Sequence, residues 1–415
     1  MAPGPTGTAT AEGAATSSYE RLAARFRPIF ARIAESAVER EQQRRLPREE
    51  VSWLKEAGFT AVRVPEELGG SGATLSELFG LLVELGEADS NLPQLLRAHF
   101  LATEEQLRRP ASERRDHWLR LIGQGLIFGN AISERTDHEI GRLQTKLVEK
   151  DGRLLLNGTK FYCTGSLLAD WITVRAERAP GELVMVQVPA SAPGVEQYDD
   201  WDGLGQQTTA SGTVEFTDVE VDPEHVTPFV RTHTPHTALA QLVLLASLVG
   251  VCRRATRDAT EFVQKRQRSY SHASAALPKD DPLVQQLVGK LHSATFAAQA
   301  TLESAVRSVE RAHRAVLAGS EVEAATVQGE IDVSKAQVVL VDLVLTTVNQ
   351  LFDVGGASIV SLQRRLDRHW RNARTLAVHN PVLYKARDVG DHVINGSTPV
   401  FAWLPGAPPE EAGEA

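Results

Sequence analysis

The hydrophobic pattern of this 415-residue chain changes its period twice, and this change restricts the possible folds more than any other feature. In the first part apolar residues recur at helical spacing, and in the middle part short runs of β-forming residues alternate with Gly, Pro, Asn and Asp. Long helical periods then return. We therefore predict an α+β chain with a helical domain at 18–125, a β-barrel or sandwich at 126–230 and a helical domain at 231–399.

Composition and charge narrow the class of protein and its partners. With 42% hydrophobic and 23% charged residues, the chain is long and apolar enough to bury a core. Its formal net charge of -9 argues against nucleic acid or an anionic membrane as a partner, because both favour a basic surface. Two cysteines, Cys163 and Cys252, are too few for a disulfide scaffold and fit a cytoplasmic protein. No metal-ligand spacing is found in the sequence.

The chain ends and the longest apolar run carry no targeting or membrane signal. Residues 1–17 are small and Pro/Gly-containing, so we expect a disordered leader and no signal peptide, and we expect a loose acidic tail at 400–415. The longest apolar run, Ala238 to Cys252, contains Gln241 and Ser247. It is shorter than the ~20 residues that cross a bilayer, which predicts a buried helix.

Local signals predict the limits of three further segments. A helix is expected to end at Gly58, followed by an extended passage over Phe59–Pro65. Helical spacing predicts one helix over Leu92–Leu107. The last helix is expected to run from about Arg374 to Ile394, with Pro381 near its beginning.

The sequence NGTKFYCTGS at Asn157–Ser166 concentrates small hydroxyl residues where a predicted strand ends. A loop of this kind brings a hydroxyl and bare backbone amides against a flat ligand, because glycine removes the side-chain obstruction. An ordinary polar strand end is the alternative. Cys163 is either a catalytic thiol or, since it alternates with polar residues along a β-run, a packed side chain.

Three motifs in this order carry a resemblance to a known family: Val64–Gly70 (VPEELGG), Asn157–Lys160 (NGTK) and Phe352–Ala357 (FDVGGA). Together they resemble the acyl-CoA dehydrogenase family, over nearly everything from Tyr19 to about Pro399. The resemblance implies an N-terminal helical domain, a middle β-barrel domain, a C-terminal four-helix bundle and a homotetramer.

The sequence departs from the dehydrogenases where their catalytic carboxylate would stand. The segment Ala377–Lys385 reads AVHNPVLYK and contains no acid. With Cys163–Ser166 (CTGS) and Trp201–Gln206 (WDGLGQ), it resembles the flavin-dependent monooxygenase branch, which includes dibenzothiophene, sulfone and methanesulfinate monooxygenases. That resemblance implies reduced FMN rather than FAD, O2, a separate NAD(P)H:flavin reductase, and a flavin C4a-hydroperoxide that oxygenates a small organosulfur substrate.

The resemblance also assigns roles around the flavin ring. It places Ser166 near the flavin N5, where a hydroxyl acceptor slows loss of peroxide, and His379 near C4a, where it manages protonation. His99 would face the same pocket, although a histidine on this apolar helix is equally a buried structural residue. The polar edge of the flavin ring would form hydrogen bonds with a predicted strand and with the CTGS loop, through Asn130, Ser133 and Thr164.

Further residues would meet the ring face and the cofactor phosphate. Trp201 matches an aromatic that shields flavin or substrate, and a core tryptophan is the alternative. Arg268 matches an arginine that binds the phosphate, although it could equally belong to a solvated face beside Lys265. A neighbouring subunit would bind the same phosphate through the backbone amides of Gly355, Gly356, Ala357 and Ser358.

Three other functions stay open on the sequence alone. An FAD-dependent acyl-CoA dehydrogenase with its base elsewhere would turn over without oxygen. An amine N-hydroxylase of the same fold would oxygenate nitrogen instead of sulfur. A flavin-binding protein without catalysis would lose only stability when Ser166 or His379 is replaced.

Overall fold

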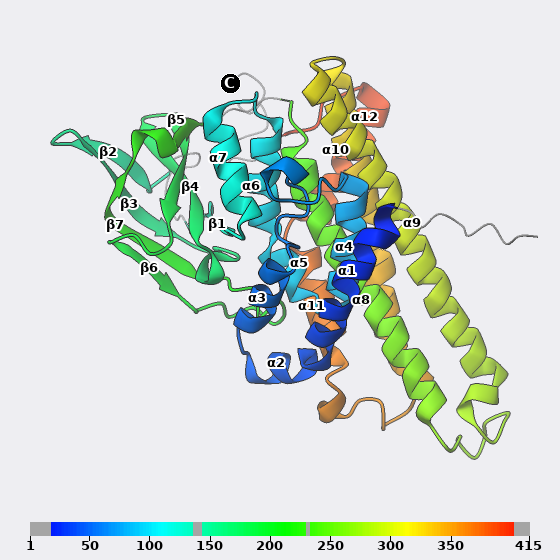
Figure 1. Cartoon of the computed structure of the whole chain (residues 1–415). Helices are drawn as coiled ribbons and strands as arrows, with labels where there is room; N and C mark the ends of the chain where they lie inside the picture. Colours follow the sequence, from blue (N-terminus) through cyan, green and yellow to red (C-terminus); the bar gives the residue numbers. More distant parts are fainter. Residues whose placement is uncertain (1–17, 136–142, 230–232, 402–415) are drawn as a thin grey trace, which may run out of the picture.

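In a computed structural model of the chain, helices, a β-sheet and a second set of helices follow one another as the sequence predicts (Figure 1). The structure describes residues 18–135, 143–229 and 233–401, so the predicted leader and residues 402–415 of the predicted tail lie outside it. The N-terminal helices are α1 (Ser18–Glu35), α2 (Ala37–Gln43), α3 (Arg48–Glu56), α4 (Leu75–Ala88), α5 (Asn91–Leu95), α6 (Arg97–Arg108) and α7 (Glu113–Gly123).

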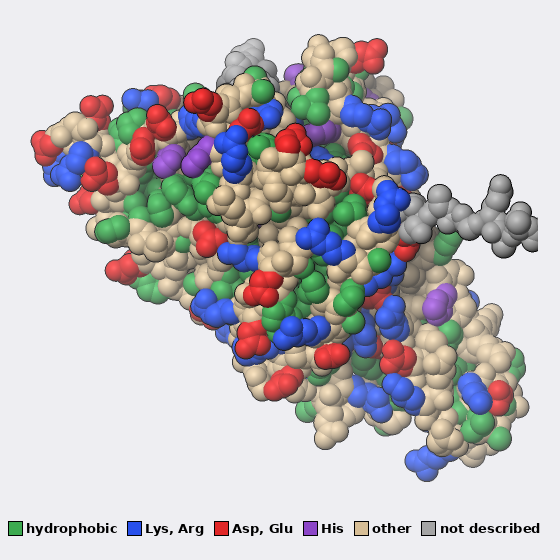
Figure 2. All heavy atoms as spheres, in the orientation of Figure 1, with side chains coloured by type: hydrophobic (Ala, Val, Ile, Leu, Met, Phe, Trp, Pro, Cys, Tyr) green, Lys and Arg blue, Asp and Glu red, His purple; other side chains and the backbone are tan. Residues whose placement is uncertain are grey.

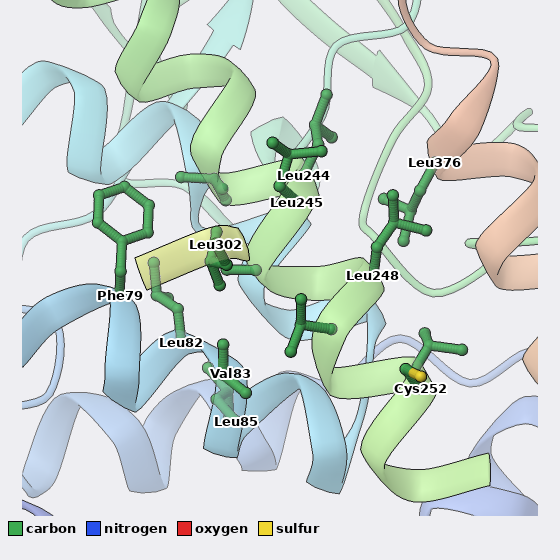
Figure 3. Packing of buried hydrophobic residues seen from close by; sticks show 14 of the residues in the cluster. Phe79, Leu82, Val83, Leu85, Leu244, Leu245, Leu248, Cys252, Leu302 and Leu376 are labelled. Atoms are coloured by element: carbon green, nitrogen blue, oxygen red, sulfur yellow. The ribbon is translucent and has the colours of Figure 1, made fainter. Parts of the chain in front are cut away.

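Helix α4 begins at a capping box and buries its apolar face in the core. Its start is fixed by a capping box, in which the Glu77 N–H donates to the Thr74 hydroxyl at 3.1 Å and the Thr74 N–H donates to the Glu77 carboxylate at 2.8 Å. The apolar face of α4 packs against α8 (His236–Lys265) and, more weakly, α9 (Pro282–Ala318). Figure 3 shows their leucines in one apolar cluster, so the N-terminal helices share a core with the C-terminal bundle.

The remaining helices form the bundle around α8. They are α10 (Val322–Gln350), α11 (Asp367–Ala377) and α12 (Val382–Asn395). Helix α8 is long and apolar enough to cross a membrane, but 83% of its most apolar window is buried inside the protein. It contacts α4, α9, α10 and α11 at once. The prediction of a buried helix over Ala238–Cys252 is therefore confirmed.

The middle of the chain forms one mixed sheet. Its strands are β1 (Phe128–Ala131), β2 (Lys146–Lys150), β3 (Arg153–Lys160), β4 (Trp171–Ala179), β5 (Glu182–Pro189), β6 (Val195–Tyr198), β7 (Thr213–Val221) and β8 (Val226–Pro228). They are ordered β6-β7-β3-β2-β4-β5-β8, and β1 pairs with β4 in parallel. Along β5 the residues Val184, Val186 and Val188 point into the core, as period-2 alternation requires. The sequence did not reveal β8, a three-residue strand that ends in proline.

Three predicted segments were wrong in detail, two in the N-terminal domain and one near the end of the chain. Phe59–Pro65 forms successive turns, in which Val62 N–H donates to Phe59 and Val64 N–H to Ala61, instead of an extended passage. The helix predicted over Leu92–Leu107 is divided at Leu96, which has φ -85° and ψ 0°.

The helix predicted over Arg374–Ile394 is also divided. Helix α11 ends at Ala377 and α12 begins at Val382, immediately after Pro381. Proline lacks an N–H and disfavours helical geometry in the residue before it, so a helix cannot continue through Asn380 and Pro381. As a result His379 lies in a connection between helices, where its N–H still donates to the Leu376 carbonyl at 3.3 Å but its ring faces another element.

The surface seen in Figure 2 carries acidic and basic side chains interspersed, with no segregation of one sign on that face. Several of them are paired at close range; for example, Arg27 contacts Glu20 at 2.7 Å and Glu84 at 2.8 Å. Exposed pairs of this kind contribute little to stability, but they neutralise the local charge.

Candidate active site

The loop that follows β3 places Ser166 directly beside β1. Gly165 has φ +78°, and a Cβ atom added to it would lie 2.4 Å from the carbonyl oxygen of Leu95, so only glycine fits here. A Cβ atom on Gly129 would lie 2.7 Å from Ser166 Cα. The Ser166 side chain is 1% exposed and donates its hydroxyl hydrogen to the Cys163 carbonyl at 2.7 Å. Its oxygen lone pairs remain available to accept a hydrogen bond.

A buried oxygen without a partner lies next to this loop. The backbone N–H of Asn130 in β1 faces the carbonyl of Thr164 at 3.4 Å, while the Asn130 Oδ1 atom is buried and has no hydrogen-bond partner in the described part of the chain. The Thr164 hydroxyl accepts from Ser211 at 3.0 Å. A buried polar atom left unpaired costs about 1–3 kcal/mol, which favours a ligand that supplies the missing donor. The structure therefore brings Asn130, Thr164 and Ser166 together.

Ser133, predicted on the same strand, lies outside this group. Its side chain is exposed, and its backbone carbonyl accepts from the Phe161 N–H at 2.9 Å. In the structure Ser133 therefore forms an isolated antiparallel β-bridge with Phe161.

His379 faces Arg97, the first residue of α6. The Arg97 Nη1 atom lies 2.9 Å from His379 Nε2, and since a guanidinium group can only donate, Nε2 accepts and the ring proton belongs on Nδ1. The neighbouring Asn380 anchors the connection, because its amide donates to Gln241 at 2.6 Å and its carbonyl accepts from Gln337 at 3.0 Å.

The His379 ring is neutral near physiological pH. Desolvation, and then the positive charge of Arg97, lowers the pKa of His379 to about 3. Nevertheless the side chain is solvent exposed. The ring thus has protein on one side and solvent on the other, and we call the space beside His379 and Arg97 the recess.

The two parts of the site meet at the junction of α5 and α6. Gly165 approaches the carbonyl of Leu95 closely, and Arg97, two residues further along, contacts His379. The loop that carries Ser166 and the connection that carries His379 thus flank the same three-residue segment.

His99 lies in the protein interior. It has no exposed surface, and both ring nitrogens face backbone groups, with Nε2 2.7 Å from the Thr60 carbonyl and Nδ1 3.5 Å from the Phe128 N–H. Desolvation lowers the pKa of His99 to about 4, so the ring is neutral. These contacts favour the alternative, a buried structural histidine, and the role of His99 at the flavin stays a prediction.

Trp201 is half-buried and holds its own loop. Its indole N–H donates to the Gly205 carbonyl at 3.1 Å, and Gly203 packs on its ring. The ring also meets Tyr162 edge to face at 5.9 Å between centroids. Trp201 is therefore connected to the loop of Ser166 through Tyr162, and its contacts account for its position without a ligand.

The predicted phosphate-binding residues lie together, but far from Ser166 and His379. Tyr270, two residues from the exposed Arg268, donates its hydroxyl to the Gly355 carbonyl at 3.0 Å, and the Gly356 N–H donates back to it. Gly356, Ala357 and Ser358 are exposed. Arg268 follows the C-terminal end of α8, and Gly355 packs against Phe262 near that end. Arg97 contacts Ala240 near the N-terminal end of α8, and the 25 residues from Ala240 to Lys265 span roughly 37 Å.

Two residues of interest were missed in the sequence. Arg97 contacts His379, and its only sequence signal was an arginine at the first position of a helix, where the helix dipole disfavours a cation. Glu330 of α10 is 2% exposed, and burial raises the pKa of its carboxyl to about 7. It lies two helical turns, roughly 10 Å, from Gln337, which contacts the His379 connection.

Comparison with known proteins agrees with this geometry. Three models of acyl-CoA dehydrogenase domains match the chain, the N-terminal domain at 16–125, the middle domain at 131–219 and the C-terminal domain at 242–383.

Among relatives, a probable FMNH2-dependent monooxygenase, SfnC of Pseudomonas putida, is 28% identical over 90% of this chain and 94% of its own length. The dibenzothiophene monooxygenase of Rhodococcus qingshengii is 29% identical over 88% and 91%. The FMN-bound structure of TdsC from Paenibacillus sp. A11-2 has a TM-score of 0.85 and 26% identity and covers 92% of this chain and 99% of that one. The predicted fold is confirmed, and the relatives support a flavin-dependent monooxygenase with FMN as cofactor. This chain belongs to the acyl-CoA dehydrogenase family.

Proposed function

We propose that this protein is an FMN-dependent monooxygenase that transfers one oxygen atom from O2 to a small organosulfur compound. The observation that carries the proposal is the neutral imidazole of His379 in a recess at the α5–α6 junction, in the segment where the resemblance places a carboxylate in the dehydrogenases. The names of the relatives supply the reaction class. Sulfide, sulfone and sulfinate are all compatible with that class.

The residues present fit an FMN ring. The unpaired Oδ1 atom of Asn130 is an acceptor for an N–H of the ring edge, and Ser166 offers lone pairs to a second N–H. Thr164 lies between them. Reduced FMN, when bound, supplies the two electrons with which O2 is activated.

The overall reaction consumes one O2 and both electrons. When the substrate is a sulfide, the sulfide, O2 and FMNH2 give the sulfoxide, water and FMN; one oxygen atom forms the new bond to sulfur, and the other leaves as water with two protons. The neutral His379 ring holds its proton on Nδ1 and offers no additional proton at neutral pH. Premature protonation, which would release hydrogen peroxide instead of oxidising sulfur, is thereby reduced.

We further propose that the active unit is a homotetramer supplied by a separate NAD(P)H:flavin reductase in the cytoplasm. The supporting observation is the separation of roughly 37 Å along α8 between Ala240, which accepts a hydrogen bond from Arg97 beside His379, and the end of the helix at Lys265, which precedes Arg268. One FMN is too short to contact both ends within one chain. A neighbouring subunit would therefore supply Arg268 and the amides of 355–358 to the phosphate.

The test adds photoreduced FMN, 18O2 and an organosulfur substrate to the protein, then measures product mass and hydrogen peroxide. We expect one labelled oxygen in the product. His379→Asn should lower product formation on the order of 100-fold, and Ser166→Ala should divert roughly tenfold more electrons to hydrogen peroxide. Glu330→Gln is the matched control, because it removes a buried carboxylate that we do not place at the reacting atoms.

The alternatives predict different results. An acyl-CoA dehydrogenase would reduce bound FAD anaerobically with an acyl-CoA and would depend on Glu330 rather than His379. An amine N-hydroxylase would label amines and leave sulfur compounds unchanged. A non-catalytic flavin-binding protein would show no labelled product, and the substitutions would alter only its stability.

A further inference from the structure

Arg97 is a cation whose hydrogen bonds do not neutralise it. Of its five N–H donors, Nε donates to the Ala240 carbonyl at 2.9 Å and Nη1 donates to His379 at 2.9 Å. The three other donors have no partner in the part of the chain that the structure describes. They belong to both terminal nitrogens, so two oxygen atoms of one ligand can accept from Arg97 at the same time.

No carboxylate compensates the Arg97 charge among the described residues. Burial alone lowers the pKa of Arg97 to about 10. On the same helix, Glu104 pairs with Arg63 at 2.5 Å and Glu105 pairs with Arg109 at 2.5 Å, and neither affects the pKa of Arg97. Both carboxylates of α6 are thus engaged elsewhere.

The other titratable groups near Arg97 are imidazoles that do not supply a negative charge. The positive charge of Arg97 contributes to lowering the pKa of His236, after desolvation and Arg108, and that of His379, after desolvation. Glu105 acts on His236 in the opposite direction but more weakly than Arg108. The recess beside His379 therefore carries a net positive charge.

We propose that Arg97 binds the anionic group of the substrate, so that the sulfur compound oxidised here is an anion of the sulfinate class rather than a neutral sulfide. This inference rests on the proposed monooxygenase function. A sulfinate has two oxygen atoms that match the two terminal nitrogens of the guanidinium group, and its sulfur keeps a lone pair for the new S–O bond. Because Nη1 also contacts His379, the bound anion lies next to that ring.

The step balances without another reactant. The sulfinate anion, O2 and FMNH2 give the sulfonate anion, water and FMN; sulfur is oxidised by two electrons, and the second oxygen atom takes up the two electrons of the flavin and leaves as water. The negative charge stays on the sulfur compound throughout, so the contact with Arg97 is kept from substrate to product.

The experiment compares two sulfur compounds of similar size, methanesulfinate and the neutral dimethyl sulfoxide, in wild type, Arg97→Gln, Arg97→Lys and Arg109→Gln. We expect Arg97→Gln to raise KM for methanesulfinate roughly 100-fold and to change KM for dimethyl sulfoxide less than about threefold. Arg97→Lys should recover part of the loss, since it restores the charge but not the paired donors. Arg109→Gln, directly after the end of the same helix, is the control and should leave both values unchanged.

A second measurement does not depend on turnover. Calorimetric titration of the FMN-loaded protein with methanesulfonate should give binding in wild type and at least about tenfold weaker binding in Arg97→Gln, with no binding of dimethyl sulfone in either. Equal loss of both substrates together with weaker binding of reduced FMN would assign the Arg97 charge to the flavin and overturn the inference. If wild type oxygenates no sulfur compound but still binds methanesulfonate through Arg97, the monooxygenase proposal fails while the anion site stands.

Discussion

Two arginines of the N-terminal helices, the buried Arg40 and the half-buried Arg97, differ in how the protein compensates their charges. The Arg40 side chain is fully buried and contacts Glu50 and Asp89, each at 2.6 Å. Arg97 meets only a backbone carbonyl and an imidazole among the residues that the structure describes. The charge of Arg40, which has a structural role, is neutralised by carboxylates of the protein itself. The charge of Arg97 is instead available to a bound ligand.

Two histidines repeat the contrast. His369 is buried, and its Nε2 atom lies 2.7 Å from Asp258, whose carboxylate also contacts Arg368 at 3.0 Å. The hydrogen bond from His369, and then the charges of Arg368 and Arg254, hold the pKa of Asp258 well below its usual range against the effect of burial, so the carboxylate stays ionised. Within the described ranges, His379 has Arg97 as its only charged contact. The histidine that contacts a carboxylate again lies in the core, and the histidine that contacts only a cation lies in the recess.

The largest expected effect is on the stability of Arg40→Met. This change removes the buried cation between Glu50 and Asp89. Glu50 then keeps only the more exposed Arg45 as a cationic partner, and Asp89 keeps only the neutral donors of Asn91. We expect the free energy of unfolding to fall by about 3–5 kcal/mol, which urea denaturation monitored by circular dichroism would measure. A loss below about 1 kcal/mol would mean that the pair is not structural and would remove the basis of the contrast with Arg97.

The sequence predicted those parts of the molecule that depend on local patterns. The order of helices and strands, the buried α8 and the glycine-dependent loop before Ser166 follow from periodicity and from Gly165, and the family resemblance carried the cofactor. The pairing of Arg97 with His379 is different, because it joins residues 282 positions apart and depends on how α5, α6 and α12 are packed.

The points that the sequence alone could not decide have physical causes too. Pro381 was recognised, but its steric effect on Asn380 outweighs the helical spacing on both sides, and the predicted single helix is two. His99 stands on an apolar helix, and no local signal distinguishes a ring that faces a ligand from one that bonds to two backbone groups. Such a distinction requires the tertiary contacts with Thr60 and Phe128.

An effect of intermediate size is expected on the pH dependence of stability, through the buried neutral ring of His99. Its pKa is about 4 in the folded protein and near 6.5 when unfolded, so between these values the unfolded chain binds more protons. Stability is therefore lost as the pH falls from 6.5 towards 4, by up to about 1.4 kcal/mol per pH unit from this ring.

His99→Gln tests this assignment, because glutamine can still donate to the Thr60 carbonyl but does not titrate. Urea denaturation of both proteins between about pH 7 and about pH 4.5 should show a shallower decline in the variant. Identical slopes in the two proteins would indicate that His99 is protonated without penalty, and the ring would then be more accessible than its contacts imply.

The smallest effect is expected for the stability of Arg97→Gln in the protein without substrate. Removing this guanidinium loses two hydrogen bonds but also removes a desolvated charge from the first turn of a helix, where the dipole opposes it. These contributions have opposite signs, so the free energy of unfolding should change by less than about 1 kcal/mol in either direction. Methanesulfonate should then raise the melting temperature of wild type and leave that of the variant unchanged, because only the wild-type recess binds the anion. A loss for Arg97→Gln as large as the one expected for Arg40→Met would show that Arg97 is a structural charge, and the distinction between the two arginines would not hold.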